Sequence, residues 1–286
     1  LDSFGANDIA VDYNTGTSGD SAVRIMLHSD SLENHRDHYD GTRLGFNPTI
    51  KIKMNESTTL DLSYEYADHE RYIDRGIPTE NGEPVERFEK ITFGGDDNLT
   101  TLKANILRAT LSKVFSDTRK GNLSIVSSDF EKMYKNYYAS GYTAGATVVT
   151  MDGYLDPTER ENTIISGNIV NEVGNHTLLV GVELIDTTNE NFRYNTFWST
   201  TSDDNEVFNI TRPMDFSVNS AGVATSNDYT ADLKSKTKSD IDVTSFFIQD
   251  QIDVSDKLKL MIGGRHDSFD ITVTDVKAGS AAARKD

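Results

Sequence analysis

The sequence predicts an all-β protein that forms part of a transmembrane, antiparallel, up-and-down β-barrel. One observation is a period-2 alternation of apolar and polar residues in about ten stretches. A second is that the connections between these stretches are alternately short and long. A third is the composition, with 12 Tyr, 13 Phe and 20 Gly against 5 Pro, which favours strands joined by many turns.

The first half of the chain contains four clear strand patterns, which we expect at 8–13, 22–28, 43–52 and 59–66. In each, one face is apolar and the other polar. The fourth strand illustrates this with Leu60, Leu62, Tyr64 and Tyr66 on one face against Asp61, Ser63 and Glu65 on the other. No convincing amphipathic helix interrupts the series.

The second half continues the pattern with different strength. Weaker alternation predicts strands near 102–115, 121–134, 160–170 and 241–253, and clear alternation predicts strands at 177–184 and 257–262. In the latter, Leu258, Leu260 and Ile262 oppose Lys257 and Lys259. The total is about ten strands.

The connections point to a barrel rather than to a sandwich or a propeller. Short connections are expected at 15–20, 55–58, 116–121, 171–175 and 254–256, and long ones at 29–41, 71–99, 135–159 and 188–240. A transmembrane barrel has tight periplasmic turns at one rim and long extracellular loops at the other. The apolar rows would then face lipid. Lys51, Asp61, Glu65 and Glu183 would face the lumen, where they could hydrogen-bond a plug.

Composition also excludes several classes of function. The net charge of −18 argues against nucleic acid as a partner, and the absence of Cys excludes disulfides and thiolate metal sites. No apolar run is long enough for a spanning helix, since the longest, 178–185, already contains Glu183. No catalytic motif is present, so we do not expect an enzyme. Because the chain opens on Leu1 without a visible signal peptide, we expect an internal part of a longer protein.

Four stretches in order carry a family resemblance. SFFIQDQIDVSDKLKLMIGGRHDSFDI (245–271) resembles a hairpin of TonB-dependent ferric-siderophore receptors. RDHYDGTRLGFNPTIKIKMNESTTLDLSYEY (36–66) resembles the early barrel of that family, and HERYIDRGIP (69–78) resembles its "D-R-G-I-P" loop. DPTERENTIISGNIV with HTLLVGVEL (156–184) resembles its central hairpin.

This resemblance implies a 22-stranded barrel in the outer membrane of a Gram-negative bacterium, with a plug in its lumen. Residues 1–286 would be one partial barrel domain, roughly strands two to eleven, with the plug, the TonB box and the C-terminal strands outside it. The implied function is active uptake of a ferric siderophore, energised by TonB through the missing N-terminal part. Outer-membrane lipid would be a further partner. No cofactor is expected, because the iron arrives already wrapped in its chelator.

Aromatic and basic residues in the long connections are the candidates for binding such a ligand. Aromatic faces would pack on its organic scaffold, and arginines would attract its anionic complex. The candidates are Arg71, Tyr72, Arg75, Tyr138, Tyr142, Arg193 and Trp198. Arg75 could instead shape its loop. The aromatic residues nearer strand ends are expected in the interfacial girdle, namely Tyr64, Tyr66, Tyr134 and Phe246.

Other readings are open at this stage. His28, His35 and His38 lack the fixed spacing of a metal site, so none is predicted. The acidic runs 94–98 and 201–206 are expected to be solvated loops rather than Ca²⁺ sites. The chain could alternatively form a passive porin. It could also be a soluble β domain for adhesion or carbohydrate binding, in which case its apolar faces would meet in a core.

Overall fold

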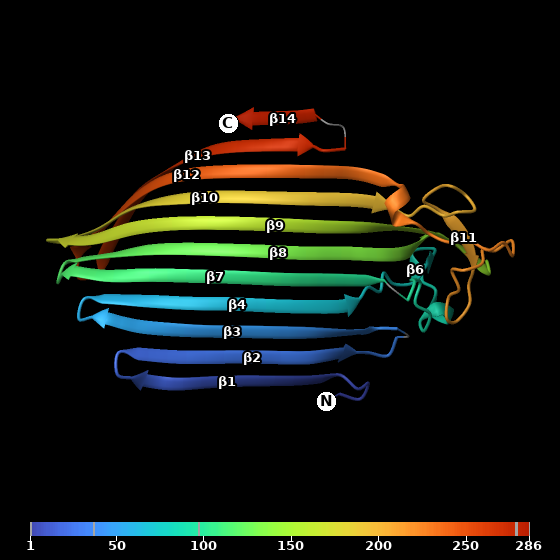
Figure 1. Ribbon diagram of the computed structural model, residues 1–286, viewed down its shortest axis with the longest axis horizontal. Coiled ribbons are helices and arrows are strands. Elements are labelled where there is room, and N and C mark those ends of the chain that lie inside the picture. Colours follow the sequence, from blue (N-terminus) through green and yellow to red (C-terminus); the bar gives the residue numbers. More distant parts are fainter. Residues whose placement is uncertain (1, 37, 97, 278–279, 286) are drawn as a thin grey trace.

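The computed structural model describes residues 2–36, 38–96, 98–277 and 280–285, with only the backbone described at 18 and 280–285. It contains one large curved antiparallel sheet in which neighbours in sequence are neighbours in space (Figure 1). The strands of the main path are β1 (Asn7–Ser18), β2 (Ser21–Glu33), β3 (Asp40–Asn55), β4 (Thr58–Tyr72), β7 (Leu99–Ser116), β8 (Arg119–Gly141), β9 (Val148–Val173), β10 (His176–Asn195), β12 (Leu233–Ser255), β13 (Leu258–Asp275) and β14 (Ser280–Lys285). The predicted all-β fold is confirmed, although the sheet is open rather than closed.

The two ends of the sheet differ as the sequence predicts. Tight turns join strands at one end, at 19–20, 56–57, 117–118, 174–175 and 256–257. At the other end lie the longer connections, of which 73–98 and 196–232 are the largest. These two contain the short strands β5 (Thr79–Glu80), β6 (Glu83–Pro84) and β11 (Glu206–Asn209) and the 3-10 turns η1 (Glu86–Phe88) and η2 (Tyr229–Ala231). In Figure 1 they crowd the right-hand end.

The prediction of a long connection at 135–159 is wrong. β8 continues to Gly141 and β9 begins at Val148, so that only residues 142–147 connect them. Tyr138 of β8 pairs with Asp152 of β9, although both residues lie within the stretch 135–159 that the sequence predicts to be a loop. Apolar and aromatic side chains occupy both faces of this extension because loops cover one of them, and the simple alternation is therefore lost.

Strand register separates an apolar face from a polar one. On the outer face, directly paired residues form the row Ile52, Leu60, Leu111, Leu123, Gly167, Val182 and Phe246. One residue along each strand, the inner face carries the row Lys51, Asp61, Thr110, Ser124, Ser166, Glu183 and Ser245. Because paired residues share a face, the two rows place apolar and polar side chains on opposite sides of the whole sheet.

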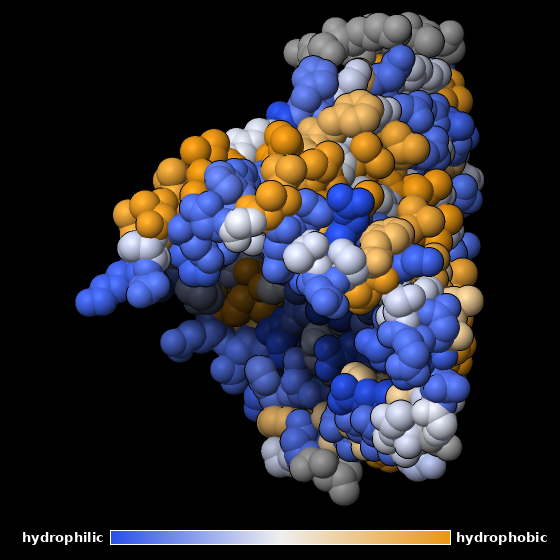
Figure 2. Space-filling view, turned by 90° about the vertical axis from the view of Figure 1, so that its left-hand side faces the viewer, coloured by the Kyte–Doolittle hydropathy of each residue, from blue (hydrophilic) through white to orange (hydrophobic). Residues whose placement is uncertain are grey.

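Away from the loop end, the rows of the apolar face have no second layer over them among the described residues. Leu123, Val182 and Phe246 are 55%, 41% and 57% exposed. Seen from the turn end, the sheet curves around a hollow lined by hydrophilic residues, with apolar patches on its outer side (Figure 2). A soluble sandwich would bury such rows in a core, so this alternative is excluded. In the described part of the chain, no helix has the length and apolar character needed to cross a membrane.

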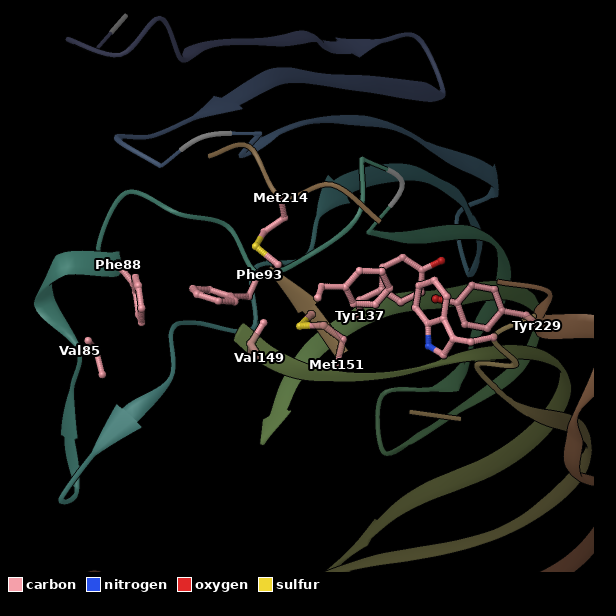
Figure 3. Close-up of a cluster of buried hydrophobic side chains, with 10 residues drawn as sticks. Val85, Phe88, Phe93, Tyr137, Val149, Met151, Met214 and Tyr229 are labelled. Carbon is pink, nitrogen blue, oxygen red and sulfur yellow. The ribbon is translucent and has the colours of Figure 1, made fainter. Parts of the chain in front are cut away.

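The buried core of the molecule lies at the loop end of the sheet, between the long connections and the ends of β8 and β9. Phe88 and Phe93 from 73–98 meet Tyr137 of β8, Met151 of β9 and Trp198 of 196–232 (Figure 3). Asn98 ties this loop core to the sheet, since its side chain accepts from the Tyr137 backbone N–H at 2.8 Å and donates to the Tyr137 carbonyl at 3.0 Å. The loops are therefore packed structures rather than solvated tails.

Candidate functional site

Six side chains gather on the inner face where β8, β9 and β10 approach the long loops. We call Arg75, Tyr134, Tyr138, Tyr154, Asp156 and Arg193 the mouth cluster. Five of them alternate along β8, β9 and β10 in phase with the polar inner row, so they point to the same side as Ser124 and Glu183. The sixth, Arg75, comes from the loop 73–98.

Tyr154 is the centre of the mouth cluster. The guanidinium carbon of Arg193 lies 3.5 Å from the centre of its ring, and Arg193 Nη1 donates to Asp156 Oδ2 at 2.7 Å. Tyr134 stacks beside Tyr154 with ring centres 5.8 Å apart. These residues line a hollow of about 580 Å³ whose walls also include Lys132 and Phe192. The hollow thus offers aromatic faces and cations together.

Arg75 connects the loop to this wall. Its Nη1 donates to Tyr154 Oη at 2.8 Å and to Asn136 Oδ1 at 3.2 Å, and its guanidinium carbon lies 4.9 Å from the Tyr138 ring centre. Partial burial acts most strongly and lowers the Arg75 pKa, but the hydrogen bonds and charge interactions with Tyr154 and Tyr134 together outweigh it and leave that pKa above its ordinary value. Arg75 therefore stays cationic.

Further basic side chains line the inner face next to the mouth cluster. Arg71 lies on the same row as Thr100 and Tyr134. On the adjacent row toward the turn end, Arg43 pairs with His69, and Leu102 pairs with Lys132. Arg43, His69, Arg71 and Lys132 border a second hollow of about 430 Å³. We call Arg43, His69, Arg71 and Lys132 the basic stripe. It contrasts with the net charge of −18.

The structure brings together only some of the residues predicted from the sequence. Arg75, Tyr138 and Arg193 belong to the mouth cluster, and Arg71 belongs to the basic stripe. The other three lie apart from the hollows. Tyr72 and Trp198 are 4% and 1% exposed, and Tyr142 packs edge-on against Phe88. In this arrangement those three support the loops.

Sequence reasoning missed Tyr154, Asp156 and Lys132. Asp152, Tyr154 and Asp156 do alternate with small or apolar residues, but the prediction of a long connection at 135–159 hides this signal. Tyr134 was expected in the lipid-facing girdle, which is wrong because it lies on the inner face against Tyr154. Tyr64 and Tyr66 do lie on the outer face, paired with Leu107 and Asn105.

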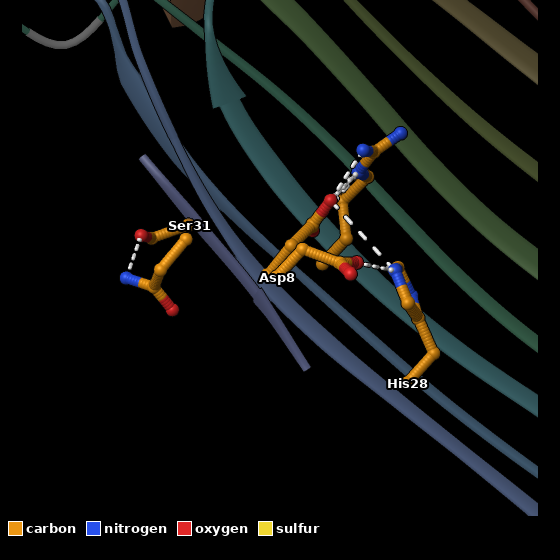
Figure 4. Close-up of polar contacts among 6 residues, drawn as sticks. Asp8, His28 and Ser31 are labelled. Carbon is orange, nitrogen blue, oxygen red and sulfur yellow. Dashed lines mark hydrogen bonds and ion pairs between the residues drawn. The ribbon is translucent and has the colours of Figure 1, made fainter. Parts of the chain in front are cut away.

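A second polar group lies on the inner face near the edge strand β1. His28 Nε2 is 3.0 Å from Asp8 Oδ2 and 3.8 Å from Asp30 Oδ2 (Figure 4). Arg43 Nε already contacts both Asp30 oxygens at 3.0 Å. The guanidinium occupies the carboxylate that a metal ion would need, so the group is best described as an ion-pair network. His35 and His38 are not part of it.

Comparison with known families decides the identity of this fold. Residues 45–286 match the family described as TonB dependent receptor-like, beta-barrel. This chain belongs to the TonB-dependent receptor barrel family. Members of that family are outer-membrane transport receptors of Gram-negative bacteria, not enzymes. A comparison with curated protein sequences gave no match.

Solved structures of other receptors share the fold of this TonB-dependent receptor barrel. The ferric-catecholate import receptor Fiu of E. coli K12 has a TM-score of 0.77 at 15% identity, covering 95% of this chain and 43% of that one. The siderophore receptor PiuA of Acinetobacter baumannii has 0.76 at 17%, covering 98% and 43%. The ferripyoverdine receptor of Pseudomonas aeruginosa has 0.74 at 15%, covering 98% and 37%. The chain thus spans about two fifths of the length of these receptors.

Proposed function

We propose that this chain is part of an outer-membrane receptor that binds a ferric siderophore from outside and passes it inward with energy supplied through TonB. The family membership and the siderophore receptors with the same fold support this reading. The observation that carries it is the mouth cluster, which faces the hollow at the end of the sheet with the long loops.

The chemistry of the mouth cluster suits a ferric chelate. A chelated iron complex has a flat or folded organic scaffold and often a net negative charge. The rings of Tyr134 and Tyr154 offer apolar faces, and Arg193 and Arg75 supply cations held in fixed positions. Guanidinium groups match carboxylate, catecholate and similar oxygens as paired acceptors.

The basic stripe gives such an anion a route away from the mouth cluster. Lys132 borders both hollows, so the two adjoin at this residue. Arg71 and Lys132 are exposed toward the inner side. A multivalent anion released by Arg193 would therefore meet further cations along the inner wall, which favours movement inward over return to solvent.

The proposal is tested with the receptor containing this sequence, expressed in a strain that lacks other siderophore receptors. Growth and uptake of radiolabelled iron are measured with defined ferric chelates of different charge. We expect uptake of at least one anionic chelate, and we expect uptake but not surface binding to stop when TonB is deleted. Diffusion of small neutral solutes that persists without TonB, with no chelate bound, would contradict the proposal and favour a passive pore.

A further inference from the structure

The outer face of the sheet carries a groove that the uptake function does not use. It lies across β7 to β10, toward the end with the tight turns, and has a volume of about 420 Å³. Its walls are the side chains of Leu111, Phe115, Leu123, Ile169, Val180 and Val182. Five of them belong to the apolar, lipid-facing rows, and the Phe115 ring lies on the same side, next to Gly121. The groove therefore opens to hydrocarbon rather than to the lumen.

Two glycines create the groove, because they leave space where side chains would otherwise stand. Gly121 and Gly167 stand in the outer rows between larger residues, with Ile169 paired to Gly121 and Leu123 to Gly167. A Cβ on Gly167 would meet Leu123 Cδ1 only at 3.7 Å, which is ordinary contact, so a side chain would fit there and fill the space. At Gly121 a Cβ would come 2.9 Å from the Asn168 carbonyl oxygen, so that position needs glycine.

Cations mark the end of the groove nearest the turn. Lys113, paired with Gly121, lines it, and its Nζ lies 5.7 Å from the centre of the Phe115 ring. Arg119, the first residue of β8, is the next outward-facing residue toward the turn, and its Nε donates to Asn171 Oδ1 at 3.0 Å. In the part of the chain that the structure describes, neither cation forms an ion pair. Two uncompensated cations therefore lie beside a slot for hydrocarbon.

We propose that this groove binds one anionic phospholipid of the leaflet on the tight-turn side. One acyl chain fills the slot over Gly167, and Lys113 and Arg119 bind the phosphate. Chain and headgroup match the apolar walls and the cations in the order that a lipid presents them. The inference depends on the membrane placement of this barrel family and not on the identity of the transported ligand.

The test uses the receptor reconstituted in phosphatidylcholine vesicles containing a minor fraction of photoactivatable phosphatidylglycerol. Crosslinked peptides are mapped by mass spectrometry. We expect labelling concentrated around Leu123, Ile169 and Val180, and a severalfold decrease in Gly167→Leu. Gly264→Leu is the matched control, because Gly264 lies on the same outer face with open space around it and away from the groove. It should leave the labelling unchanged.

Two further arms keep the result decisive. A Lys113→Gln, Arg119→Gln double variant should lose the preference for photoactivatable phosphatidylglycerol over the phosphatidylcholine analogue while still being labelled. If Gly167→Leu fails to insert, competition on the unaltered receptor replaces it, and unlabelled phosphatidylglycerol should displace the probe better than phosphatidylcholine does. Uniform labelling around the outer face, or receptor–receptor crosslinks through the groove, would overturn the proposal. Iron uptake is measured separately and tests the proposed function, so failure of the lipid proposal would leave the uptake result unchanged.

Discussion

Arg193 lies over the ring of Tyr154, with its guanidinium carbon 3.5 Å from the ring centre, while its Nη1 donates to Asp156 Oδ2 at 2.7 Å. The carboxylate fixes the guanidinium and the ring supports it from one side, so a remaining edge can turn toward the hollow. A cation held in this way loses little rotamer freedom on binding a ligand. The relationship makes Arg193 the most informative position in the mouth cluster.

Replacing Arg193 by Ala should weaken binding of an anionic ferric chelate. Loss of a charge-assisted contact to the ligand costs about 1.5–3 kcal/mol, so we expect affinity to fall at least about tenfold. The cation–π contact with Tyr154 lies within the protein and only holds the guanidinium in place. Arg193→Lys should recover only part of the affinity, because an ammonium group cannot bind two acceptors side by side. The measurement is equilibrium binding of the chelate to purified receptor.

Lys259→Ala is the matched control for that experiment, since Lys259 lies near the tight-turn end and pairs with Asp253 at 2.9 Å. Its removal also deletes one positive charge but should leave affinity unchanged. Equal losses in both variants would mean that net charge, and not the mouth cluster, determines binding.

Replacing Trp198 by Ala should loosen the loop core. Trp198 is 1% exposed and contacts Phe208 and Tyr137 with ring centres 4.9 Å and 5.3 Å away. A buried Trp→Ala change costs about 3–5 kcal/mol, and here the cost should fall on the loops because β8 and β9 are held by their strand pairing on both sides. Hydrogen exchange of residues 196–232 should therefore become faster while strand amides are unaffected. Val223→Ala, at an exposed loop position, is the control.

Arginine scanning should distinguish the two faces of the sheet. Leu60→Arg on the outer face should cost about 2–4 kcal/mol if the site lies near the bilayer midplane, because the charge would enter hydrocarbon. Thr110→Arg lies one row away on the inner face and should cost much less. Urea unfolding from vesicles measures both, and similar costs at the two positions would refute the assigned faces.

The sequence reveals the lipid-facing strands well because their two environments differ so strongly. Leu60 and Asp61 sit next to each other in the chain and on opposite sides of the sheet, and every such pair reinforces the period of two. The same rule fails at Tyr137 and Met151. There the loops bury the outward side chains, while the inner face also carries aromatics, so neither face looks wet. A two-residue alternation of apolar and polar residues cannot reveal a strand whose two faces have the same character.

The mouth cluster was predictable only in part. Arg75 reaches Tyr154 because Arg36 holds the loop, with Nη1 donating to the Glu89 carbonyl at 2.7 Å, Nη2 donating to the Ile91 carbonyl at 2.9 Å, and an ion pair to Asp74. These contacts join residues more than thirty positions apart. Composition identified the right residue types, but no local pattern shows which loop residue is brought to which strand.

The two edges of the sheet predict how the isolated chain behaves. In the described residues β1 pairs only with β2, and β14 pairs only with β13. Each edge strand leaves about half of its backbone N–H and C=O groups without partners, and in hydrocarbon each such group costs several kcal/mol. Exposed edges also invite pairing between copies. We therefore expect residues 1–286 alone to aggregate rather than insert. The complete receptor should show heat-modifiable migration on a gel, which reports a closed barrel, and the isolated chain should not. Reversible, monomeric, heat-modifiable folding of the isolated chain in bilayers would show that its edges find partners within the same molecule.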